Sequence, residues 1–183
     1  MDTNAILKYA DELFEDDRPE DAGAYLQKMA EQALEEKHYG IAMSLYNELT
    51  GFYRHIKDFD SAWNCVEQII LLLDTLDLWG TVEAATAMLN IATVYKAAGL
   101  YDTAIAIYEK CEPIFLSEHV DDSRLAGLYN NICVLALETG RNEDALIYAE
   151  KAWHIAERVP MDGESLERVR KNYNAARKAA END

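Results

Sequence analysis

A pair of helical patterns that recurs along the chain limits the folds open to it. Its clearest copy is Ala87–Leu116, where two runs with apolar residues every three or four positions flank the turn Ala98–Asp102. This spacing is typical of amphipathic helices. Gly99 stands just past the end of the first run, where a helix often ends on a residue in the left-handed conformation that glycine adopts readily. The stretch therefore predicts a helical hairpin.

The hairpin occurs four times along the chain, and the turn between its two helices has a constant length. In each copy, a residue of the first helix precedes an alanine of the second by 13 positions: Tyr9 and Ala22, Leu49 and Ala62, Ile91 and Ala104, Ile132 and Ala145. The intervals from each alanine to the next hairpin are 27, 29 and 28 residues, which gives a period of 40 to 42. The pattern predicts one turn geometry inside all four hairpins, with length differences confined to the passages between them.

The hairpin resembles a tetratricopeptide (TPR) unit. The residues at the family's slots W-x2-L-G-x2-Y and A-x3-F are Met88, Ile91, Ala92 and Tyr95, then Ala104 and Tyr108. The family period is about 34 residues, and the excess here is close to two helical turns. Longer units of this kind are similar to those of kinesin light chains and of bacterial peptide-sensing TPR regulators, mainly over residues 87 to 159.

The resemblance implies an all-α fold, a right-handed superhelical solenoid of antiparallel helix hairpins. We expect a single domain over residues 1–183, with about four hairpins near 3–38, 39–79, 81–119 and 122–160 and a C-terminal capping helix over 163–180. Pro113 lies inside an expected helix and removes one backbone hydrogen bond, which predicts a kink or an early helix end there.

Composition and charge narrow the classes of function. The net charge of −17 disfavours binding to nucleic acid and to anionic membranes. It favours a protein or peptide partner that is basic. Alternatively, the acidic residues serve only to keep the surface solvated. Three cysteines without CxxC spacing predict reduced, structural thiols. An acidic N-terminus and the lack of a long apolar run predict a cytoplasmic protein.

The sequence contains none of the common catalytic or metal-binding motifs that we searched for. There is no HExxH, GxSxG, P-loop or GxGxxG motif, and the four histidines are dispersed. Glu150, His154 and Glu157 share one helix face, but no matching ligand set stands on another helix, so a salt-bridged surface is the better interpretation. We expect no enzyme, no cofactor and no metal.

The TPR resemblance does imply a peptide-binding groove, because the first helix of each TPR hairpin lines the concave surface. The residues that it selects are Asn47, Glu48, Arg54, Asn90, Thr93, Lys96, Asn130, Asn131 and Asn172, with Ser44, Gly51, Thr86 and Val134 beside them. Three of these asparagines are spaced 41 residues apart, and an amide side chain can both donate to and accept from a peptide backbone. Arg54 and Lys96 would be isolated cations able to hold a carboxylate. Alternatively, the asparagines bond neighbouring helices within the solenoid.

Two functions follow from this pattern. The first is a non-catalytic interaction module that binds a peptide or protein segment in the concave groove. The alternative is a scaffold that forms homodimers or larger oligomers through its terminal hairpins, with Tyr173 on the last helix incompletely covered.

Overall fold

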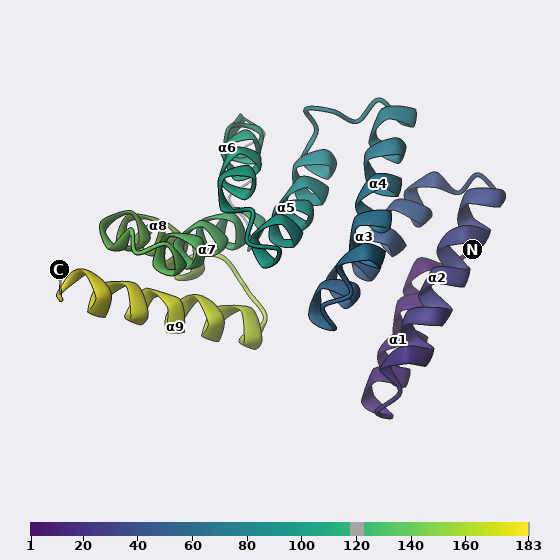
Figure 1. Cartoon of the computed structure of the whole chain (residues 1–183), viewed down its shortest axis with the longest axis horizontal. Helices are drawn as coiled ribbons and strands as arrows, with labels where there is room; N and C mark the ends of the chain where they lie inside the picture. The colour runs from purple at the N-terminus through teal and green to yellow at the C-terminus, as the bar shows by residue number, and fades with distance from the viewer. Residues whose placement is uncertain (118–122, 183) are drawn as a thin grey trace. The chain divides into compact units, whose positions relative to one another are not determined.

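The computed structural model describes residues 1–117 and 123–182, and all regular structure in these residues is helical. The helices are α1 (Thr3–Glu15), α2 (Pro19–Glu35), α3 (Tyr39–His55), α4 (Phe59–Thr75), α5 (Val82–Ala97), α6 (Tyr101–Ser117), α7 (Ser123–Glu138), α8 (Asn142–Ala156) and α9 (Gly163–Ala180) (Figure 1). The all-α prediction is confirmed, and α9 has the predicted bounds. The expected hairpin limits at residues 119 and 122, and His119, lie outside the described residues.

Six of the described helices end in the same way. One residue takes a positive φ, and the amide of the next residue donates to a carbonyl five positions back, as from Leu100 N to Tyr95 O at 2.9 Å. This bond satisfies a carbonyl that the helix end would leave free. The residues with positive φ are Asp17, Lys37, Lys57, Asp77, Gly99 and Gly140. Gly99 confirms the prediction, but four of these turns use aspartate or lysine instead of glycine.

This shared turn explains the long repeat period. Helices α2, α3 and α4 have 17 residues each, and their turn residues Lys37, Lys57 and Asp77 follow one another at intervals of 20. Each helix with its turn therefore takes 20 residues, and a hairpin takes 40. In this part of the chain, the turn within a hairpin is the same as the turn between hairpins.

The chain forms two compact units, Met1–Trp79 (unit 1) and Gly80–Asp183 (unit 2). The single domain expected over the whole chain stays a prediction. In unit 1, each helix packs against the next, and α1 also contacts α3. Gly23 of α2 permits the close contact with α3, because a Cβ atom there would come within 2.3 Å of the Phe52 ring.

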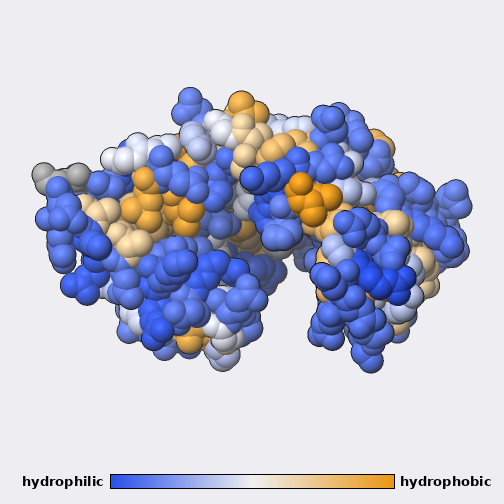
Figure 2. Space-filling view, turned by 60° about the horizontal axis from the view of Figure 1, so that its bottom comes forward, coloured by the Kyte–Doolittle hydropathy of each residue, from blue (hydrophilic) through white to orange (hydrophobic). Residues whose placement is uncertain are grey.

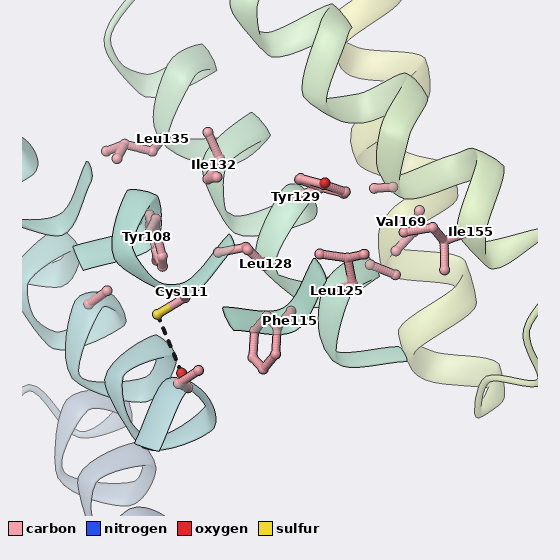
Figure 3. Close-up of a cluster of buried hydrophobic side chains, with 14 of the residues drawn as sticks. Tyr108, Cys111, Phe115, Leu125, Leu128, Tyr129, Ile132, Leu135, Ile155 and Val169 are labelled. Atoms are coloured by element: carbon pink, nitrogen blue, oxygen red, sulfur yellow. Dashed lines mark hydrogen bonds between the residues drawn. The ribbon is translucent and has the colours of Figure 1, made fainter. Parts of the chain in front are cut away.

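Unit 2 repeats this packing around a larger core. Figure 3 shows Tyr108, Cys111 and Phe115 of α6 facing Leu128 and other apolar side chains of α7. Helix α7 contacts α5, α6, α8 and α9. Helix α9 packs against α7 and α8, as α7 packs against α5 and α6, and therefore takes the place of the first helix of a further hairpin.

Of the two alternatives predicted at Pro113, the early helix end is wrong, because α6 continues to Ser117, and the kink stays a prediction. Phe115 lies two residues beyond the proline and is fully buried in the core of unit 2. Burying a phenylalanine side chain contributes about 1.5–3 kcal/mol. This contribution offsets the single backbone hydrogen bond that the proline removes.

We expect Phe115→Ala to lower the free energy of unfolding by about 3–5 kcal/mol, since it leaves a cavity in a closely packed core. Urea unfolding followed by circular dichroism measures this. Leu116→Ala is the matched control, because Leu116 is 53% exposed, and it should change stability by less than about 1 kcal/mol. Equal losses for both variants would contradict the assignment of Phe115 to the core.

Candidate functional site

The predicted asparagine register falls on three helices that follow one another in unit 2. Asn90 lies on α5, Asn131 on α7 and Asn172 on α9, and α7 contacts both of the other helices. All three residues are half-buried. The first helices of unit 2 therefore carry half-buried amide side chains at intervals of 41 residues.

Asn172 also serves the packing of the helices. Its Nδ2 donates a hydrogen bond to Oδ1 of Asn130 on α7, at 2.9 Å. Asn130 is only 5% exposed, so this bond satisfies a polar group inside the unit. This bond agrees with the alternative stated from the sequence, in which the asparagines bond neighbouring helices within the solenoid. Asn131 is the more accessible of the two adjacent asparagines on α7.

Two further predicted groove residues contact their own unit. The Lys96 Nζ lies 3.6 Å from Oε1 of Glu138 on α7, so the expectation of an isolated cation is wrong for Lys96. The Thr93 hydroxyl donates to the backbone oxygen of Asn90 at 2.6 Å, and Thr93 is 8% exposed. Both interactions hold side chains of α5 in place beside the asparagine row.

In unit 1, the corresponding surface of α1 and α3 has a groove of about 250 Å³. The predicted residues Glu48 and Gly51 line it, together with residues that the sequence did not select: Leu7, Ala10, Asp11, Phe14, Leu26, Phe52 and His55. The residues of α1 were missed because the first hairpin fits the repeat pattern poorly. Glu48 is an exposed residue, but partial desolvation of its carboxylate raises its pKa, and the Asp11 carboxylate raises it further.

Other kinds of site find less support in the described residues. No group of three or more histidine, cysteine, aspartate or glutamate side chains in residues 1–117 and 123–182 could hold a metal ion. Over that same part of the chain, the helices are too short or too polar to span a bilayer. The face shown in Figure 2 is mainly hydrophilic, with hydrophobic residues in separate patches.

We expect Asn172→Ala to lower the free energy of unfolding by about 1–3 kcal/mol, because it leaves the buried Asn130 amide without its partner. Asn174→Ala, two residues away at an exposed position of α9, should be nearly neutral. Thermal unfolding of both variants tests this expectation. If both were neutral, the bond between Asn130 and Asn172 would not contribute to stability.

Glu48 should make stability depend on pH. A carboxyl group whose pKa is higher in the folded state destabilises the fold when it is ionised, and this cost disappears as the pH falls below the pKa of the unfolded chain. We therefore expect Glu48→Gln to raise the melting temperature at neutral pH, but not at about pH 3, below the usual glutamate pKa of about 4.3.

An NMR titration of the Glu48 carboxyl group provides the direct check. Its pKa should lie above the usual value in the native protein and fall toward that value in Asp11→Asn. A native Glu48 that titrates at or below the usual pKa would contradict both causes, the desolvation of its carboxylate and the Asp11 charge.

The comparisons with known proteins agree with this architecture. A family model described as tetratricopeptide repeat matches residues 83–158. No curated protein matches the sequence. Among solved structures, a putative kinesin light chain from Podosopora anserina with nearly identical TPR-like repeats shows 17% identity and a TM-score of 0.71, covering 98% of this chain and 87% of that one.

A second solved structure, BtubC (BKLC) from P. vanneervenii, shows 23% identity and a TM-score of 0.63, and covers 97% of this chain and 81% of that one. At these identities, the likeness concerns the fold. Residues 83–158 therefore match the tetratricopeptide repeat model, and the fold of the chain is a TPR-like solenoid similar to the repeats of kinesin light chains.

Proposed function

We propose that this protein is a non-catalytic interaction module that binds an extended segment of another protein along the first helices of unit 2. The TPR fold typically serves protein–protein interaction, and TPR proteins are generally non-catalytic scaffolds. The observation that carries the proposal is the row α5, α7 and α9, which sets half-buried asparagines at 41-residue intervals on neighbouring helices.

Asn131 is the central contact in this proposal. It lies on the middle helix of the row, with Asn90 on one side and the bonded pair Asn130 and Asn172 on the other. An amide at this position can accept from a backbone N–H group and donate to a backbone carbonyl of a bound strand. The Lys96 and Glu138 pair marks the edge of the same surface and offers one charge of each sign.

The partner is proposed to be a protein or peptide, and a basic one in view of the net charge of −17. On unit 1, the residues proposed to bind are Asn47, Glu48 and Arg54. The pKa of Glu48 is raised by partial desolvation of its carboxylate and by the Asp11 carboxylate nearby. A cation placed beside Glu48 and Asp11 would relieve their repulsion. A cytoplasmic location stays a prediction.

Self-association is the second candidate, and it is favoured by the exposure of aromatic residues on α1. Tyr9 and Phe14 are 46% and 40% exposed. Tyr173, the residue first expected to be uncovered, instead stacks on Trp153 of α8 with ring centroids 5.8 Å apart. A homodimer through the first hairpin should show a molar mass in light scattering that rises with concentration, and a constant monomer mass would exclude it.

The proposal that the asparagine row of unit 2 binds a peptide can be tested by peptide display on the purified protein. The selected peptides are then counter-selected on Asn90→Ala/Asn131→Ala. We expect a peptide consensus whose affinity falls at least about tenfold in this variant, the loss expected for one or two amide hydrogen bonds. Asn174→Ala is the matched control and should bind like the native protein. A consensus that binds all three proteins equally would place the binding surface elsewhere.

A further inference from the structure

A polar pocket of about 370 Å³ lies in unit 1 between α2, α3 and α4. Its volume falls within the range of about 300–1,000 Å³ that is typical of ligand sites. The lining contains the carboxylates of Glu31 and Glu67, the hydroxyls of Tyr46 and Tyr53, and several amides, and none of its described residues is lysine or arginine. Helix α3 contributes the two tyrosines, and the second helices α2 and α4 contribute the other lining residues, whereas the groove of about 250 Å³ lies mainly on α1 and α3.

Both tyrosines of this pocket lie beside its acidic groups. Burial raises the pKa of Tyr46, and Glu31 and Cys65, which also line the pocket, raise it further. Burial raises the pKa of Tyr53 as well, and Cys65 and Glu31 again contribute. Tyr46 is 3% exposed, and its hydroxyl makes no hydrogen bond within the part of the chain that the structure describes. A hydroxyl of this kind is an acceptor that a ligand could use.

Unit 2 has a pocket at the equivalent place, and there the chain supplies its own cation. The helix pair α3 and α4 corresponds to α7 and α8 with an offset of 83 residues, which aligns Cys65 with Tyr148 and Asp58 with Arg141. The unit 2 pocket is smaller, about 190 Å³, and both Tyr148 and Arg141 line it. Arg141 Nη1 lies 4.0 Å from Oδ2 of Asp144, another lining residue.

Unit 1 therefore differs from unit 2 in two ways that act together. A small cysteine stands where unit 2 has the large Tyr148, which leaves more room. Asp58, at the position of Arg141, does not line the unit 1 pocket, so the described lining of that pocket contains no cation. The lining does contain carboxylate, hydroxyl and amide acceptors. Gln27 Nε2 donates to Oε1 of Glu31 at 2.7 Å and so holds this carboxylate in position.

We propose that the pocket between α2, α3 and α4 binds an arginine side chain of a protein partner, which supplies the cation that Arg141 supplies to the pocket of unit 2. A guanidinium group carries five N–H donors in a planar fork, which suits a site rich in carboxylate, hydroxyl and amide acceptors. Its flat face can also stack on a tyrosine ring. This site is separate from the asparagine row and does not depend on it.

The test uses the full-length ¹⁵N-labelled protein and the tripeptide acetyl-Gly-Arg-Gly-amide, with the uncharged citrulline tripeptide as its isostere. Saturable amide shifts should appear at the lining residues of α3 and α4 with the arginine peptide and be absent with citrulline. Glu31→Gln should weaken binding about tenfold, because it removes a charge-assisted hydrogen bond. Tyr46→Phe should weaken it several-fold at an unchanged melting temperature, since its hydroxyl has no bond to lose in the described chain.

Two control variants distinguish binding in this pocket from general attraction to the acidic protein and from binding at the asparagine row. Glu35→Gln removes the same charge one helical turn from Glu31, outside the pocket, and should leave the affinity unchanged. Asn90→Ala/Asn131→Ala should also bind the arginine peptide normally. Equal shifts with citrulline, an equal effect of Glu35→Gln, or no shifts at millimolar peptide would each overturn the proposal.

Discussion

Close contact between helices at one alanine in each hairpin is the constraint on which the rest of the structure depends. Ala22, Ala62, Ala104 and Ala145 are all 0% exposed. Each lies in the first turn of a second helix, at a fixed distance from the turn residue that ends the preceding helix. Interiors of proteins are packed almost without voids, so a larger side chain at these positions would force the helices apart.

The contacts that follow are mostly between neighbours in the sequence. Every helix contacts the next one within its unit, and α1 with α3, α5 with α7, and α7 with α9 are the next-nearest pairs among the described helices. Stability in such an array is a sum of local terms, which lets individual positions change without loss of the fold. The exchange of Cys65 for Tyr148, and of Asp58 for Arg141, between equivalent hairpins is an example.

This freedom explains why one fold can carry two different surfaces. The first helices of unit 2 present a row of amides, in which Asn130 and Asn172 connect α7 to α9 and Asn131 lies beside them. Unit 1 presents a pocket rich in acceptors between α2, α3 and α4. Both surfaces are polar, so the two proposed recognition surfaces would act through hydrogen bonds and charge set on an apolar scaffold.

The repeat could be predicted from the sequence, because the 3.6-residue periodicity and the constant interval to the alanines depend only on local chain geometry. The sequence also predicted the bounds of α9 and the turn at Gly99. It did not predict the left-handed conformation of Lys37 and Lys57, which is imposed on residues that do not favour it. That α6 continues past Pro113 depends on tertiary packing, since burial of Phe115 outweighs the local loss.

For the candidate site, the 41-residue spacing correctly set three asparagines on successive first helices. Which amide is buried, and that Asn172 bonds Asn130, depends on the rotation and separation of α7 and α9, which no local pattern encodes. The ion pair of Lys96 and Glu138 likewise could not be predicted from a local pattern. Its partners are 42 residues apart and meet only when α5 packs on α7. Local geometry fixed where the helices are, and packing between them fixed which side chains remain available to a partner.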